Sequence, residues 1–99
     1  HPAILRHPGN GRATLYLGRR RNSHVEGYAQ AESDAILEAL WAHVTGPRFV
    51  YEHVWRKGDL VMWDNRSTMH RRDPFDAAAR RVMHRTQIKG HQKPVAFAA

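Results

Sequence analysis

The spacing of hydrophobic and polar positions changes twice along the chain, and each change predicts a different element. Two short apolar runs flank Gly9-Asn10-Gly11, and Asn-Gly between such runs is typical of a β-hairpin, here over residues 2–18. From Ala31 to Thr45 the apolar residues instead line one helical face; they are Ile36, Leu37, Leu40, Trp41 and Val44. Gly46-Pro47 ends this helix.

From Arg48 onward the hydrophobic pattern repeats every two residues. Aromatic and β-branched residues alternate with others over 49–55, which predicts a strand. Shorter extended stretches are predicted at 60–63, from Met69-His70 onward, and at 80–88. The fold class is therefore mostly β, antiparallel, with one covering α-helix. Four or five strands do not close a barrel, so we expect a sheet edge that another part of a longer chain completes.

Composition narrows the class of protein. A chain of 99 residues has room for one domain, and 41% hydrophobic residues exclude a disordered segment. The absence of cysteine excludes disulfides and thiolate metal sites, so a metal would need His, Asp or Glu. No apolar run reaches the roughly 20 residues of a membrane span, which favours a soluble, cytoplasmic protein. The start at His1-Pro2 in place of Met leads us to expect a fragment.

Charge suggests an anionic partner. The 16 Lys and Arg residues outnumber 9 Asp and Glu residues, a net charge of +7, and such a balance favours nucleic acid or another anion. One hypothesis is thus a non-catalytic binding module; its basic residues would be Arg19-Arg20-Arg21, Arg66, Arg71 and Arg72. Its binding would weaken steeply with salt. Tyr51 and Trp55 argue against it, because they alternate within a core-like strand and not among exposed arginines.

Eight histidines make metal binding the next question. His24-Val25-Glu26 together with His70 would supply two imidazoles and one carboxylate, the facial triad of non-haem Fe(II) sites. The triplet lies in a loop-like stretch, however, and such a triplet arises easily in a histidine-rich chain. His70 is the better supported candidate ligand, because it directly follows a predicted strand and turn over 60–68. The alternative for His70 is an ordinary surface or hydrogen-bonded core histidine.

The last predicted strand carries two arginines on one face. Arg81 and Arg85 would lie about 13 Å apart along a strand, too far to clamp one carboxylate together. That spacing suits two different anionic groups in one cavity. An exposed basic face is the alternative.

These residues together resemble a known family. Residues 58–70 read G-D-x-x-x-W-D-N-x-x-x-x-H, and Arg81 opens R-x-x-x-R eleven residues after His70. With the His1-Pro2 opening and the 7–12 turn, the pattern resembles the C-terminal part of the taurine/2,4-dichlorophenoxyacetate (TauD/TfdA-type) Fe(II)/2-oxoglutarate-dependent dioxygenases over nearly all of 1–90. The resemblance implies that residues 1–99 form the C-terminal part of one double-stranded β-helix, or jelly-roll, domain.

The resemblance also implies roles for individual residues. His70 would be the distal histidine ligand of Fe(II), and Arg81 would pair with the distal carboxylate of 2-oxoglutarate. Arg85 would face 2-oxoglutarate or the substrate anion. Trp63 and Asn65 would shape the turn that aims His70. No residue of the chain is assigned as catalytic.

The same resemblance implies a reaction. A small anionic organic substrate (a sulfonate, alkyl sulfate or aryloxyalkanoate) would be hydroxylated with O₂, releasing succinate and CO₂, with no nucleic-acid or membrane partner. The family's His-x-Asp pair lies upstream of the segment that this chain matches, so His70 would be one ligand of three. His24-Val25-Glu26 falls where the family places no ligand. The chain alone is therefore expected to be inactive, and homo-oligomerisation is left open.

Overall fold

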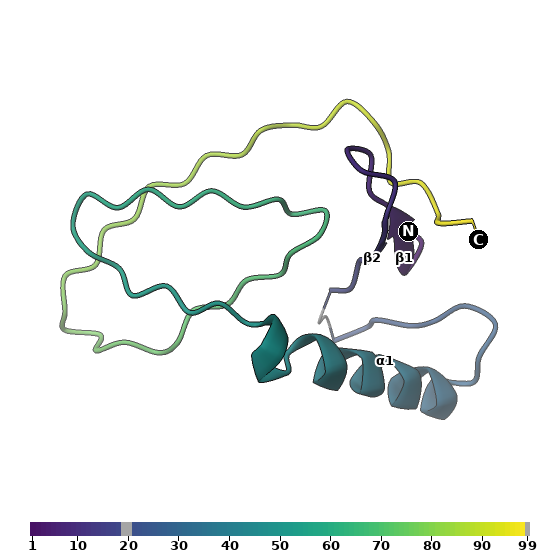
Figure 1. The fold of residues 1–99 in the computed structure, drawn as a ribbon. Helices are drawn as coiled ribbons and strands as arrows, with labels where there is room; N and C mark the ends of the chain where they lie inside the picture. Colours follow the sequence, from purple (N-terminus) through teal and green to yellow (C-terminus); the bar gives the residue numbers. More distant parts are fainter. Residues whose placement is uncertain (19–20, 99) are drawn as a thin grey trace. The chain divides into compact units, whose positions relative to one another are not determined.

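The computed structural model describes residues 1–18 and 21–98, which fall into two compact units (Figure 1). The hairpin unit comprises His1–Tyr16 and Trp63–Ala99, and the helical unit comprises Leu17–Met62. The expectation that the chain belongs to one domain stays a prediction.

The hairpin unit begins with the predicted β-hairpin. Strand β1 (Ile4–Arg6) pairs antiparallel with β2 (Ala13–Leu15), with Leu5 opposite Thr14. The Gly11 amide donates to the His7 carbonyl at 2.8 Å, and Gly11 has a φ of 72°, a conformation that glycine adopts without steric cost. The hairpin predicted from the Asn-Gly signal is confirmed.

The end of the chain lies along β1. The Arg6 amide donates to the Val95 carbonyl at 2.9 Å, and the Phe97 amide donates to the Ile4 carbonyl at 3.0 Å. Leu5, opposite Ala96 in an isolated bridge, is only 4% exposed and is the buried apolar residue of this unit. The sequence of the tail has no periodicity that predicts its pairing with β1, because β1 lies about ninety residues away along the printed sequence.

The helical unit contains the predicted helix. Helix α1 (Gln30–Val44) buries Leu37 and Trp41 on its apolar face, so the helix prediction over 31–45 is confirmed. Ser33 on the same face is fully buried, and its Oγ accepts a hydrogen bond from the Val25 amide at 2.7 Å. This bond fastens the preceding loop to the helix. A single 3-10 turn, η1 (Pro47–Phe49), follows.

The strands predicted at 49–55, 60–63, 69–70 and 80–88 are not formed in the described chain. Outside β1 and β2, the described residues form no strand, and Figure 1 shows these stretches as continuous trace. A period-two pattern favours extended backbone, but a strand also needs a neighbour for its N–H and C=O groups. Large apolar side chains in these stretches remain exposed, including Leu60 at 88% and Ile88 at 91%.

The described chain thus contains one helix and one two-stranded antiparallel sheet. The larger jelly-roll stays a prediction. Within the described ranges, no helix combines the length and apolar content needed to cross a membrane.

Candidate functional site

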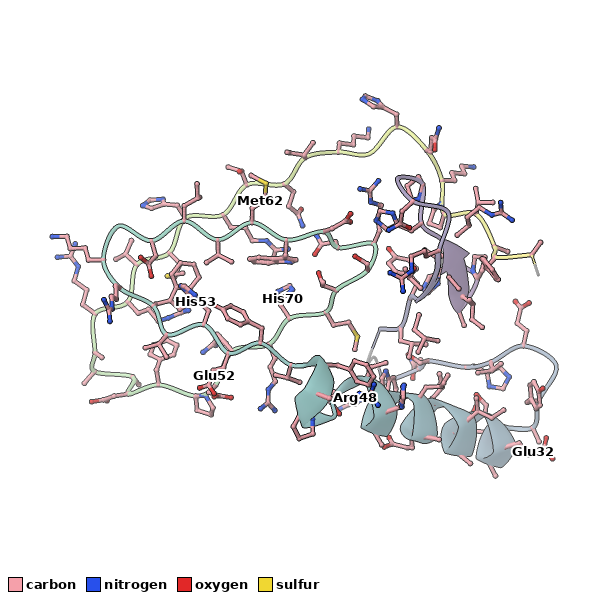
Figure 2. The ribbon with its side chains drawn as sticks, in the orientation of Figure 1. Glu32, Arg48, Glu52, His53, Met62 and His70 are labelled. Atoms are coloured by element: carbon pink, nitrogen blue, oxygen red, sulfur yellow. The ribbon has the colours of Figure 1, made fainter. Side chains whose placement is uncertain are left out.

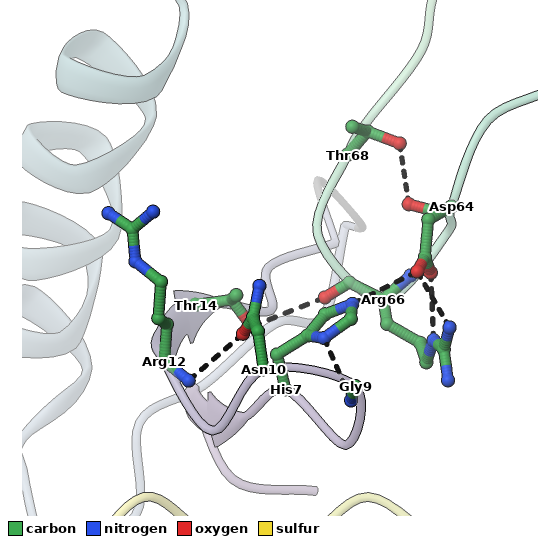
Figure 3. A network of polar contacts seen from close by, with 8 residues as sticks. All are labelled: His7, Gly9, Asn10, Arg12, Thr14, Asp64, Arg66 and Thr68. Atoms are coloured by element: carbon green, nitrogen blue, oxygen red, sulfur yellow. Dashed lines mark hydrogen bonds and ion pairs between the residues drawn. The ribbon is translucent and has the colours of Figure 1, made fainter.

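Asp64 organises the turn that leads to His70. Its Oδ1 accepts the Arg66 amide at 2.9 Å, the bond that defines an Asx turn. Its carbonyl accepts the Ser67 amide at 3.2 Å and the Thr68 amide at 3.0 Å. The same carbonyl accepts the Thr68 hydroxyl at 2.6 Å (Figure 3). Residues 64–68, called the Asp64 turn below, therefore hold their shape through their own short-range bonds.

Arg66 donates two side-chain hydrogen bonds to the Asp64 carboxylate. Its Nε lies 2.8 Å from Oδ1 and its Nη2 lies 2.7 Å from Oδ2, the two-pronged geometry of a strong ion pair. The side-chain and backbone bonds from Arg66, followed by the bond from His7, hold the pKa of Asp64 well below its ordinary value of 3.8. The bond to Asp64 raises the pKa of Arg66 in turn. Asp64 is therefore a carboxylate throughout the physiological pH range.

Two side chains of the hairpin reach the Asp64 turn. His7 Nε2 lies 3.0 Å from Asp64 Oδ2, and the Thr14 hydroxyl donates to the Arg66 carbonyl at 3.3 Å (Figure 3). The Gly9 amide donates to His7 Nδ1 at 3.1 Å. The His7 side chain is 13% exposed, against 33% for Asp64. The Asp64 turn is thus linked to the hairpin through contacts that no local sequence pattern predicts.

His70 lies just beyond the Asp64 turn, in a stretch without helix or strand (Figure 2). Its ring centroid is 4.9 Å from that of Trp63, with the planes tilted by 47°. Trp63 is held in turn by its Nε1, which donates to Asn65 Oδ1 at 2.8 Å. The His70 side chain is exposed, and neither ring nitrogen has a hydrogen-bond partner among the described residues. A lone pair on this imidazole is therefore accessible to a metal ion.

Arg81 and Arg85 belong to the same unit as His70 and are also exposed. The Arg81 guanidinium lies over the Phe75 ring at 5.1 Å, and the Arg72 guanidinium lies over the same ring at 4.9 Å. Because no strand forms at 80–88, the shared strand face predicted for Arg81 and Arg85 is not formed. Within residues 1–18 and 21–98, no hydrogen bond, ion pair or ring contact joins these arginines to His70.

Within the described residues, no group of three His, Asp or Glu side chains could bind a metal. His24 and Glu26 belong to the helical unit and His70 to the hairpin unit, so the triad of these three residues stays a hypothesis. His24 and Glu26 are exposed in the loop that the Val25–Ser33 bond fastens to α1. His70 alone, with its free imidazole nitrogens, suits one position of an iron site. Arg19 and Arg20, predicted as part of a basic loop, lie outside the described residues.

Sequence reasoning missed His7, Asp64 and Arg66 as parts of this site. For Asp64 and Arg66 a signal existed, since an aspartate two residues before an arginine in a turn is typical of an Asx turn closed by an ion pair. For His7 there was none, because its partner lies 57 residues away.

Acidification tests the Asp64 ion pair. Since the pKa of Asp64 is lowered in the folded state, its contribution to stability is complete above 3.8 and is lost as the pH falls below that value. Asp64→Asn should lower the free energy of unfolding at pH 7 by about 1 kcal/mol, because the carboxylate is partly exposed. The difference should shrink toward pH 3, as measured by thermal unfolding of the complete protein.

Asp76→Asn is the matched control, because Asp76 Oδ1 accepts only the Ala78 amide, at 2.9 Å, and the structure gives it no arginine partner among the described residues. Equal stability of Asp64→Asn and the unsubstituted protein at pH 7 would contradict the prediction.

The chain is similar to a known protein family and to several known proteins. Residues 1–87 match the family model described as "Taurine catabolism dioxygenase TauD, TfdA family". The chain is 45% identical over 91 residues, 92% of its length, to the alpha-ketoglutarate-dependent 2,4-dichlorophenoxyacetate dioxygenase of Burkholderia sp. strain RASC, covering 30% of that protein. It is 40% identical over 83 residues, 84% of its length, to the pentalenolactone F synthase of Streptomyces arenae, covering 28% of that protein.

An alkylsulfatase of Acinetobacter baylyi is 34% identical over 90 residues, which are 91% of this chain and 28% of that protein. The chain therefore spans somewhat under a third of the length of the curated relatives that it matches. No solved structure matches the chain.

Proposed function

The chain belongs to the taurine catabolism dioxygenase TauD, TfdA family, and from that membership we propose that its complete protein is an Fe(II)- and 2-oxoglutarate-dependent dioxygenase. One observation carries the proposal. The G-D-x-x-x-W-D-N-x-x-x-x-H motif ending at His70, followed by Arg81 and Arg85, lies wholly within the family-matched residues 1–87. The 2,4-dichlorophenoxyacetate dioxygenase and the alkylsulfatase among the relatives support a small anionic organic substrate. Succinate and CO₂ are the co-products of the proposed reaction.

Within this proposal, His70 supplies one imidazole ligand to Fe(II), and the other two ligands come from parts of the complete protein outside this chain. Bound Fe(II) would supply the redox chemistry by which O₂ oxidises 2-oxoglutarate and the substrate. The task of the chain is orientation. The Trp63 ring, 4.9 Å from His70 and held by Asn65, would limit the rotation of the imidazole.

Arg81 and Arg85 supply the two cationic positions. Arg81 would bind the distal carboxylate of 2-oxoglutarate through its planar fork, a bidentate contact that a lysine cannot reproduce. Phe75 supports the face of this guanidinium at 5.1 Å and leaves its N–H edge open for the carboxylate. Arg85, four residues on, would meet the anionic group of the substrate. Two separate cations thus orient two separate anions near one reacting centre.

We also propose that the exposed extended stretches at 49–55, 60–63 and 80–88 become strands of a jelly-roll in the complete protein. Their period-two pattern and their uncovered apolar side chains, such as Leu60 and Ile88, support this. Pairing would satisfy the backbone groups of these stretches and bury those side chains.

A basic nucleic-acid-binding module has less support. Arg66 is neutralised by its two-pronged pair with Asp64, and Arg71 lies 3.7 Å from a carboxylate oxygen of Asp73. Two of the arginines that such a module would use are therefore already paired within the chain.

Succinate formation tests the proposed function. The complete protein, supplied with Fe(II), O₂ and 2-oxoglutarate, should form succinate when an aryloxyalkanoate, an alkyl sulfate or a sulfonate is added, and a chelator should stop the reaction. Absence of 2-oxoglutarate-dependent succinate with all three anion classes would contradict the proposal. Nucleic-acid binding that weakens steeply with salt would then favour the binding module.

A further inference from the structure

His7 connects two segments that are far apart in the sequence. It lies directly after β1, yet its Nε2 is 3.0 Å from Asp64 Oδ2, 57 residues further along the chain. The bond from Thr14 to the Arg66 carbonyl joins the same two segments at 3.3 Å (Figure 3). Of these two links, only the one through His7 reaches the carboxylate on which the Asp64 turn is built.

The hydrogen bonds of His7 assign a tautomer to its ring. The Gly9 amide donates to Nδ1 at 3.1 Å, so Nδ1 accepts and the ring N–H is at Nε2. That N–H points to Asp64 Oδ2, so the ring is held at both nitrogens. The fit is also tight, because a Cβ at Gly9 would lie 3.2 Å from His7 Cε1.

We propose that His7 is a positioning residue for His70 and acts through Asp64. The path runs from His7 to the Asp64 carboxylate, through the Asp64 turn that this carboxylate closes, to His70 and its Trp63 support. Without His7 the turn keeps its own bonds to Arg66 and Thr68 and its link to Thr14, but its carboxylate loses the bond that holds it to the hairpin. The inference rests on the proposed iron-binding role of His70.

A metal ligand depends on such outer supports. Residues that orient a ligand typically change metal affinity 10- to 100-fold when they are removed. His7 acts one layer further out than a group bonded directly to the ligand, so its loss should weaken Fe(II) binding by about tenfold, the lower end of that range. An effect on affinity separates this role from a contribution to stability alone.

Anaerobic calorimetric titration of the complete protein with Fe(II) tests the inference. His7→Ala should weaken binding, while His7→Gln should restore it, because the glutamine amide can donate to Asp64 from a position similar to that of Nε2. His91→Ala is the matched control, since it removes an exposed histidine of the same unit that lies beyond the residues matching the family model. Circular dichroism at the titration temperature establishes that each variant is folded.

The outcomes are distinct. His7→Ala that is folded and binds Fe(II) as tightly as the unsubstituted protein would overturn the role of His7, and so would His7→Gln that binds as weakly as His7→Ala. If His7→Ala does not fold, His7→Phe decides, because it keeps a ring of similar size and removes the hydrogen bonds of both ring nitrogens; unchanged Fe(II) affinity in His7→Phe overturns the inference. An unsubstituted protein that binds no Fe(II) contradicts the proposed function as well.

Discussion

Replacing His70 by alanine is expected to abolish both Fe(II) binding and 2-oxoglutarate-dependent succinate formation. The exposed imidazole, with two unbonded nitrogens next to the Trp63 ring, is the one iron ligand that this chain contributes to the proposed site. Since even an outer support is worth 10- to 100-fold in metal affinity, the loss of a direct ligand should cost more than about 100-fold. Titration with Fe(II) and the succinate assay, both on the complete protein, measure the two effects.

His91→Ala is the control for His70→Ala. His91 is an exposed histidine of the same unit, and it lies beyond the residues that match the family model. The control should bind Fe(II) and form succinate as the unsubstituted protein does. Iron-dependent succinate formation that survives His70→Ala would remove this residue from the site and would leave the motif without its proposed chemistry.

Arg81→Lys should raise the KM for 2-oxoglutarate by about 10- to 100-fold. The substitution keeps the positive charge but replaces a planar two-pronged donor with a single ammonium. One lost hydrogen bond to a charged group is worth about 1.5–3 kcal/mol, which corresponds to that range. The KM should move more than kcat, because Arg81 is proposed to bind the distal carboxylate, away from the reacting end of 2-oxoglutarate.

Arg72→Lys provides a closely matched control for Arg81→Lys. Both guanidiniums lie over the Phe75 ring, at 4.9 Å for Arg72 and 5.1 Å for Arg81, so both substitutions remove a similar ring contact. Only Arg81 occupies the position eleven residues after His70. An equal rise in KM for both variants would assign the effect to the packing around Phe75 and not to a carboxylate contact.

The hairpin and helix α1 could be predicted because their signals are local. Gly9-Asn10-Gly11 determines a turn within a few residues, and the stripe containing Leu37 and Trp41 repeats within one helix. The later strands could not be predicted in the same way. Alternation over 49–55 favours an extended backbone, but the hydrogen bonds of a strand depend on a partner that the pattern does not specify.

The candidate site shows the same division. His70, Arg81 and Arg85 are predicted from a motif that resembles a known family, and such a motif is a property of one contiguous stretch of sequence. His7 was assigned no role, because its significance depends on Asp64, 57 residues away. The pattern around His7 would be identical whether or not the hairpin met the Asp64 turn. Contacts between distant segments have to be observed in three dimensions.

The most direct test of the central claim is a crystal structure of the complete protein prepared anaerobically with Fe(II) and 2-oxoglutarate. We expect His70 to bind the iron through a ring nitrogen and Arg81 to make a bidentate contact with the distal carboxylate of 2-oxoglutarate. Iron held by other residues, with His70 free in solvent, would contradict this expectation.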